Sequence, residues 1–159
     1  MRIFGAVLIL ASCAVSGAAV SGFFTRRAVT LEAFLGLITH VKNQINGFLY
    51  PLDSIFENYS EPTLERIGFL ASLRKNGGEA AFGEYRGRLC LAENEERELE
   101  GFFRELGSHT AQDEARHCAY FEARIGELAK NARDELAKKK RMSLSLGALL
   151  GILIAVILI

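Results

Sequence analysis

The chain has 159 residues, half of them hydrophobic, and its 19 basic side chains balance its 19 acidic ones. This length suits one domain with short appendages. The charge balance disfavours a nucleic-acid partner, because no excess of positive charge would attract phosphates. Three cysteines without close spacing argue against a disulfide framework and a cysteine-based zinc site. We expect Cys90 and Cys118 to be buried and to behave as small apolar residues.

Both ends of the chain are apolar and nearly free of charge, with Arg2 as the one charged side chain before residue 25. Residues 3–24 provide enough uncharged helix to cross a hydrocarbon core, which needs about 20 residues. Residues 142–159 are more hydrophobic still and predict a second transmembrane helix. Almost all charged residues lie between these ends, so we expect a separate domain over residues 25–141.

Small residues recur at four-residue spacing in each predicted transmembrane helix. This spacing places them on one face, where they allow another helix to approach closely. We therefore predict a helix-packing face at each end, although a weakly hydrophobic anchor would explain the first pattern equally well and chance often produces the second. The residues concerned are Ala14, Ala18, Gly22, Gly147, Gly151 and Ala155.

Basic residues flank the predicted transmembrane helices on the side of the middle domain. The positive-inside rule then places this domain in the cytoplasm and both termini across the membrane. The residues that determine this topology are Arg26, Arg27, Lys138, Lys139, Lys140 and Arg141.

The stretch "LASC" at residues 10–13 matches the pattern at which bacterial lipoprotein signal peptides are cut and lipidated. Lipidation of Cys13 would export a domain whose flanks carry the basic residues that normally stay inside. The apolar run also continues past Cys13 to Phe24, and the segment before the cysteine would be a poor signal peptide. We favour an uncut membrane helix and keep a lipidated, exported protein as an alternative.

Apolar residues of the middle segment recur at three- and four-residue steps, which predicts an all-helical domain. A first helix is expected over about residues 30–49, with an apolar stripe along one side. Pro51 restarts a short second helix, and Pro62 opens a third that runs through Leu73. The "NGG" at residues 76–78 is a strong stop signal.

A weaker fourth helix should carry Phe82 and Leu89. The fifth begins near Glu93 and ends at Gly107, which supplies a left-handed cap. The sixth starts at Ser108 or Thr110, keeps its apolar stripe to residue 136 and meets no turn signal before the second membrane stretch. The predicted fold is an antiparallel bundle of about six helices with a transmembrane helix at each end.

Few residues have spacing that suits chemistry. His109, Asp113 and His117 are four residues apart and would share a helix face, so a metal-binding sensor is a second alternative. For His40 we expect a solvated or helix-packing role. The acidic run "ENEERELE" predicts a solvated helix face that could also dock a basic partner. No residue is assigned to catalysis or to a cofactor.

The order of these parts resembles the stage III sporulation protein AB family of endospore-forming bacteria. An acidic residue after the "LG" turn and a glutamine one helical turn later are expected for the family, but this chain has Thr110 and Glu114. The stretches that carry the resemblance are "GAVLILASC", "YPLDSIF", "FFRELGSHTAQDEARH" and "KKKRMSLSLGALLGILIAVILI".

The resemblance implies a fold like the cytoplasmic helical domain of type II secretion system F proteins. It further implies a structural role as a membrane platform component of the channel complex between mother cell and forespore. The implied partners are a secretion-type ATPase, membrane ring proteins and membrane lipid, and a homo-oligomer of the chain is a further option. It transfers no catalytic residues, no metal and no cofactor, and we expect a two-pass protein of the mother-cell membrane that faces the forespore.

Overall fold

The computed structural model describes residues 2–47, 52–108 and 110–158, with side chains described for 22–45, 52, 54–108, 110, 112–142 and 145. Within these ranges the chain is helical and has no strand, which confirms the predicted all-α fold. The elements are α1 (Arg2–Gly47), α2 (Leu52–Glu57), α3 (Pro62–Ile67), α4 (Phe69–Asn76), α5 (Gly78–Tyr85), the 3₁₀ helix η1 (Arg86–Arg88), α6 (Glu93–Glu105) and α7 (Ala111–Leu158).

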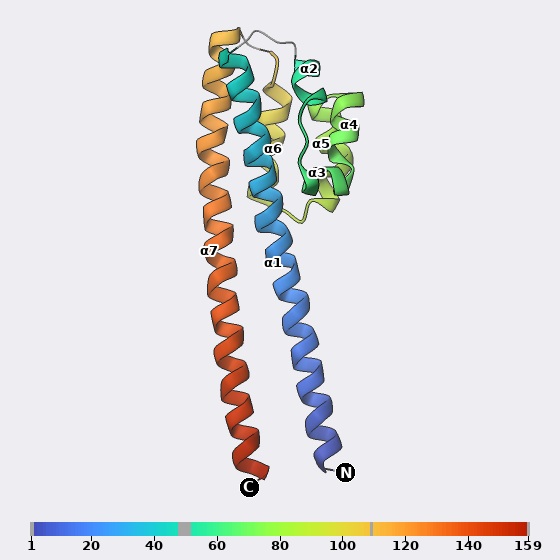
Figure 1. The fold of residues 1–159 in the computed structure, drawn as a ribbon, viewed down its shortest axis with the longest axis vertical. Helices are drawn as coiled ribbons and strands as arrows, with labels where there is room; N and C mark the ends of the chain where they lie inside the picture. Colours follow the sequence, from blue (N-terminus) through green and yellow to red (C-terminus); the bar gives the residue numbers. More distant parts are fainter. Residues whose placement is uncertain (1, 48–51, 109, 159) are drawn as a thin grey trace.

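Two long helices, α1 and α7, lie side by side and run antiparallel, and the short helices gather beside one end of this pair (Figure 1). Helix α7 runs unbroken from the domain into the apolar C-terminal stretch, as predicted. Helix α1 was expected to begin near residue 30, but it is continuous from Arg2. The reason lies in the sequence, because no glycine or proline interrupts residues 23–30.

Gly68 divides the predicted third helix into α3 and α4, so that prediction was wrong. Its φ of 90° lies in the left-handed region, and its N–H donates to the Glu65 carbonyl oxygen at 2.9 Å. The Tyr85 hydroxyl would lie only 3.0 Å from a Cβ at this position, so a larger residue has no room. The start of α3 matches the prediction, because Pro62 occupies the first helical turn and Glu61 caps it by accepting from the Leu64 N–H at 2.8 Å.

Two predicted stop signals are confirmed. Helix α4 ends at Asn76, and the following Gly77 has a φ of 82°. Helix α6 ends at Glu105, and Gly107, two residues later, has a φ of 86°. The prediction for Cys90 was wrong, because this residue lies half-buried in the loop before α6 with a φ of 55°, whereas Cys118 is fully buried.

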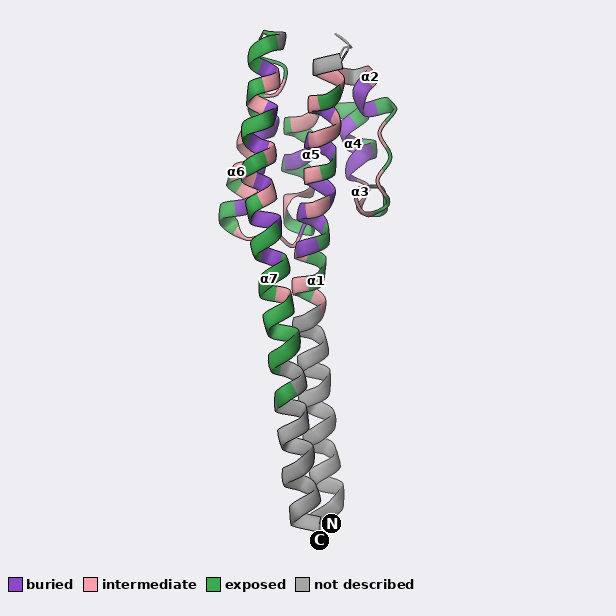
Figure 2. Cartoon of the chain, turned by 60° about the vertical axis from the view of Figure 1, so that its left-hand side comes forward, coloured by how far each residue is buried: buried purple, intermediate pink, exposed green. Residues whose placement is uncertain are grey.

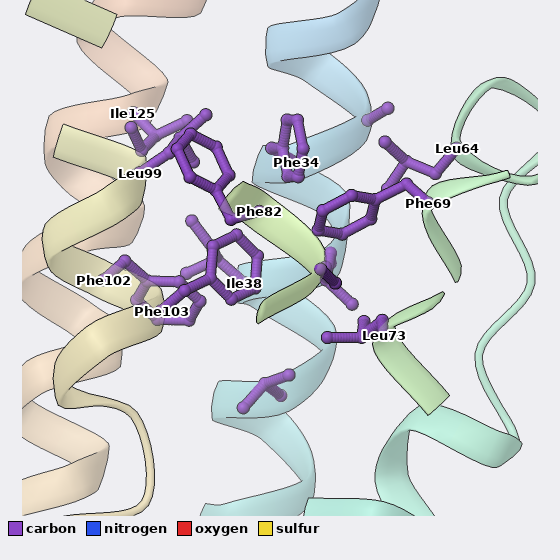
Figure 3. Packing of buried hydrophobic residues seen from close by; sticks show 14 of the residues in the cluster. Phe34, Ile38, Leu64, Phe69, Leu73, Phe82, Leu99, Phe102, Phe103 and Ile125 are labelled. Atoms are coloured by element: carbon purple, nitrogen blue, oxygen red, sulfur yellow. The ribbon is translucent and has the colours of Figure 1, made fainter. Parts of the chain in front are cut away.

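The core is built around phenylalanines from four helices (Figure 3). The Phe34 ring of α1 lies 5.1 Å from the Phe69 ring of α4 and 6.0 Å from the Phe103 ring of α6, and Phe82 of α5 stacks on Phe103 at 5.7 Å. Edge-to-face and stacked pairs at these distances add to the stabilisation from burial. The short helices are thereby held against α1 and α7 as one unit.

The predicted apolar stripes of the two long helices form the inner wall of this core. Figure 2 shows their buried residues on the faces turned toward each other and toward the short helices. On α1 these are Leu31, Phe34, Ile38 and Val41, and on α7 they are Cys118, Phe121, Ile125, Leu128 and Ala132. Phe48, which would extend the first stripe, lies outside the described residues.

Within the part of the chain that the structure describes, no helix is long and apolar enough to cross a membrane. The transmembrane helices predicted for residues 3–24 and 142–159, and the division of the chain that depends on them, stay predictions. Among the predicted packing residues, only Gly22 has a described environment, and a Cβ there would meet no described atom within 4 Å. The side chains of Cys13, Ala14, Ala18, Gly147, Gly151 and Ala155 lie outside the described residues.

Two glycine substitutions should move stability in opposite directions. Gly83 lies inside α5, where a Cβ meets nothing within 4 Å, so Gly83→Ala should raise the free energy of unfolding by about 0.5–1 kcal/mol. Gly107→Ala should lower it by at least about 1 kcal/mol, because of the left-handed φ and because Leu52 Cδ1 lies 2.7 Å from the new Cβ. Denaturation of the purified chain followed by circular dichroism measures both. A Gly107→Ala protein as stable as Gly83→Ala would contradict this account of the turn.

Candidate functional site

The candidate site is the neck, defined as residues 22–32 of α1 and 129–142 of α7, where the two long helices leave the domain. A small buried cluster joins them there, made of Ala28 and Leu31 on α1 with Ala129 and Ala132 on α7. Alanine side chains let two helix axes approach closely. This contact was not predicted, although the sequence has small residues at 28, 129 and 132, with the last two at helical spacing.

Arg27 is the central polar side chain of the neck. Its Nη2 and Nε donate to Glu95 Oε1 at 2.7 and 3.0 Å, and Nε also lies 3.0 Å from Glu95 Oε2. Glu95 is fully buried, and its Oε2 also accepts from the Ala92 N–H at 2.8 Å. The hydrogen bonds that Arg27 donates to Glu95 are the main cause that raises the pKa of Arg27 above its ordinary value. Glu95 is thus a buried charge with both of its oxygens satisfied.

The same guanidinium reaches the second long helix. Arg27 Nη1 donates to Glu135 Oε2 at 2.7 Å, so one side chain joins α1, α6 and α7. Arg133 and Glu32 add an ion pair between α7 and α1 at 2.5 Å, although both of these side chains are more exposed. Together these contacts set the register in which α1 and α7 pair.

The acidic run at the start of α6 was predicted to be a solvated face, which holds for the exposed Glu93 but is wrong for the buried Glu95. Glu95 is buried beneath Arg27, Glu96 accepts from Arg86 Nε at 2.6 Å, and Glu98 accepts from Arg124 Nε at 2.9 Å. The prediction that this run docks a separate basic partner stays a prediction. Spacing alone did not reveal these ion pairs within the chain, because the arginines lie on other elements, 68, 10 and 26 residues away from their glutamates.

The remaining predicted topology residues differ from Arg27. Arg26 and residues 138–141 are exposed, and none of them makes an ion pair with an acidic side chain that the structure describes. Lys139 Nζ lies 3.3 Å from the centre of the Phe24 ring, which is a cation–π contact between α7 and α1. This contact places the basic residues of both helices at one level of the neck.

Further up the pair, Glu122 of α7 binds two residues of α1. Thr39 Oγ1 donates to Glu122 Oε1 at 2.8 Å, and Lys42 Nζ pairs with Oε2. The hydrogen bond from Lys42 is the largest cause that lowers the pKa of Glu122 below its ordinary value, and the bond from Thr39 acts in the same direction. The charged form of Glu122 therefore supports the pairing of α1 with α7.

The turn between α6 and α7 holds a second cluster. Glu114, His117 and Cys118 bring their potential ligand atoms within 4.8 Å of one another, and all three lie on α7. His117 stacks on the Phe102 ring at 5.6 Å and also contacts Phe121, with its side chain 9% exposed. Among the described residues this is the single cluster of three metal-ligand types.

A role in closing the turn explains this cluster. Glu114 Oε1 accepts from the Gly107 N–H at 3.0 Å and so satisfies a backbone donor of the turn. Burial, with a smaller effect from Glu114, raises the pKa of the Cys118 thiol to about 12, so the sulfur carries its proton at neutral pH.

The structure does not group the residues of the metal site that was predicted as an alternative, His109, Asp113 and His117, among those that it describes. Asp113 is exposed, accepts from Thr110 Oγ1 at 2.8 Å and lies 3.5 Å from Arg116, which are contacts of a helix start. His117 is grouped with Glu114 instead, and His109 lies outside the described residues. His40 packs against Tyr59 with ring centres 4.9 Å apart, in line with a helix-packing role.

Comparison with known proteins adds one finding to this geometry. The family model described as stage III sporulation protein AB matches residues 2–159, which is nearly the whole chain. No curated protein and no solved structure matches.

Removing the buried charge of the neck should destabilise the fold strongly. Glu95→Gln keeps the shape but leaves Arg27 without its main partner, so we expect a loss of about 3 kcal/mol in the free energy of unfolding. Glu93→Gln is the matched control, because Glu93 is exposed and pairs with Arg97 within one helix, and it should change stability by less than about 0.5 kcal/mol. Chemical denaturation measures both, and equal effects would refute the assigned role of Glu95.

Stability should depend on pH through Glu122. Its lowered pKa means that its pairing contributes fully above the ordinary glutamate value of about 4.3 and is lost as pH falls through the lower folded value. Melting temperatures measured from pH 7 down to pH 3 should therefore fall more in the parent than in Glu122→Gln. Parallel curves for the two proteins would show that Glu122 does not support the pairing.

Proposed function

This chain belongs to the stage III sporulation protein AB family, and we propose that it acts in endospore formation as a structural platform protein rather than an enzyme. In this proposal residues 3–24 and 142–159 anchor it in the mother-cell membrane that faces the forespore. The helical domain lies in the mother-cell cytoplasm and binds other proteins of the channel complex, among them a secretion-type ATPase and membrane ring proteins.

The continuity of α1 and α7 is the observation that carries the proposal. Each long helix runs from an apolar chain end into the folded domain without a flexible linker. Exposed basic residues collect where the two uncharged ends begin, and this distribution supports a cytoplasmic domain. Such an arrangement suits a protein that holds a binding domain in a fixed position at a membrane.

The domain itself has the properties of a rigid binding module. Its four-phenylalanine core packs the short helices on α1 and α7, and ion pairs tie α6 to both long helices through Arg27 and Arg124. A displacement of α6 by a bound partner would therefore displace α1 and α7 as well, through the Arg27–Glu95 and Arg124–Glu98 ion pairs. This supports a role in which the binding of a partner to the domain moves the membrane end of the two long helices.

The alternatives make different predictions. A lipidated, exported protein would lose its first twelve residues and gain mass at Cys13. A metal-binding sensor would bind zinc stoichiometrically through His109, Asp113 and His117, whereas Asp113 is already bonded to Thr110 and lies near Arg116 at the start of α7. The platform role requires no change in the contacts that the structure shows at the neck and at the turn between α6 and α7.

Breaking helix continuity below the domain tests the proposal. Inserting two glycines after Lys138 should preserve the core, which lies above that point, but weaken the helix there by about 1 kcal/mol per glycine. Inserting two alanines at the same place is the matched control, since it changes length and register equally but keeps the helix. Each variant replaces the parent gene in the sporulating host.

We expect the glycine variant to reach the membrane fraction yet support far fewer spores than the alanine variant. Proteins that co-purify with the chain, identified by mass spectrometry, should include other channel components for the parent and the alanine variant. Equal spore counts for the two insertions would rule out coupling through α7. Absence of the parent from the membrane fraction would refute the anchored platform.

A further inference from the structure

Five basic residues of the neck are exposed and make no ion pair with any acidic side chain that the structure describes. Around them, Arg27 is already bound to Glu95 and Glu135, and Arg133 is bound to Glu32. The five exposed basic residues have no such partner among the described residues, and the sequence contains no acidic residue after Glu135. We call these residues the collar, and they are Arg26, Lys138, Lys139, Lys140 and Arg141.

The collar surrounds the helix pair. Successive residues of an α-helix are about 100° apart, so four consecutive basic residues, 138–141, point to all sides of α7. The Phe24–Lys139 and Arg27–Glu135 contacts put residues 24–27 of α1 at the same level. A ring of positive charge is thus formed, in contrast to a patch on one face.

Exposed apolar side chains adjoin the collar on the side of the chain ends. Phe23 on α1 is 47% exposed and Met142 on α7 is 62% exposed. Beyond them the sequence has no charge up to the C-terminus, and a single arginine, Arg2, up to the N-terminus. Positive charge followed at once by apolar surface is the order that a helix meets when it passes from headgroup phosphates into hydrocarbon.

This order decides which anion the collar suits. An acidic protein or a nucleic acid would need a basic face on the domain. Most basic side chains of the domain are instead paired with acidic ones, as Arg86 is with Glu96 and Arg124 is with Glu98. Lipid headgroups surround a membrane helix on all sides, as the collar does. The phosphate of an anionic phospholipid would also lie beside Phe23 and Met142, where its acyl chains find apolar contact.

We infer that the collar binds the headgroups of anionic phospholipids and that this binding holds the domain at the membrane surface. The inference rests on the proposed membrane anchoring and adds to it a preference for one lipid class. Lys139 would have to divide its contacts between Phe24 and the lipid, whereas residues 138, 140 and 141 are free to reach phosphates on either side.

Native mass spectrometry of the full chain in nonionic detergent tests the inference. The probes are phosphatidylglycerol, which is anionic, and phosphatidylcholine, which is zwitterionic. The collar variant carries Lys138→Gln, Lys139→Gln, Lys140→Gln and Arg141→Gln. The matched control removes four exposed charges from the domain through Arg66→Gln, Lys75→Gln, Arg104→Gln and Arg116→Gln. Circular dichroism checks that both variants keep the parent's helix content.

The parent should bind phosphatidylglycerol at least about tenfold more tightly than phosphatidylcholine, from the attraction expected for several basic side chains near an anionic surface. The control should keep this preference and the collar variant should lose it. Added salt should reduce the preference, because exposed charges are screened.

Other results would overturn the inference. These are equal binding of both lipids by the parent, an equal loss of preference in control and collar variants, or displacement of phosphatidylglycerol by inorganic phosphate, which would indicate a phosphate site without a lipid. Failure of the parent to bind any lipid would also overturn it. The proposed anchoring is judged separately, by whether the chain is in the membrane fraction of cells, so the two failures are distinguishable.

Discussion

A carboxylate withdrawn from water has to be neutralised where it lies, and Glu95 is such a group. Its only charged partner among the described residues is Arg27, which also holds Glu135, so three helices meet at one guanidinium. If α1 and α7 slipped by a single residue, the fork of Arg27 would no longer face both carboxylates. The register of the long helices, and with it the wall on which the short helices pack, depends on this satisfied charge.

The sequence predicted what local pattern controls. Apolar spacing identified the stripes on α1 and α7, and glycine with proline marked the ends of α4 and α6 and the start of α3. It missed the break at Gly68, because an isolated glycine within an apolar repeat is compatible with a continuing helix until the approach of Tyr85 is known. It also missed Glu95, whose burial depends on an arginine 68 residues away.

In the candidate site, too, the features that depend on sequence order were predicted and those that depend on tertiary contacts were missed. The exposed basic residues at 26 and 138–141 could be identified as a group, since their position beside uncharged stretches is a property of sequence order alone. The different state of Arg27, paired on both sides, could not. Likewise the spacing of His109, Asp113 and His117 suggested ligands on one face, but the position one residue after Asp113 is the one that turns inward, to the amide of Gly107.

Helix α7 has one more consequence, which concerns distance. An α-helix rises about 1.5 Å per residue, so the stretch from Ala111 to Lys138 spans about 42 Å, and no hinge is available along it to shorten that length. The turn between α6 and α7 therefore stands at a fixed height above the collar. In the proposed membrane orientation, a partner that contacts this turn would have to extend about that far from the collar.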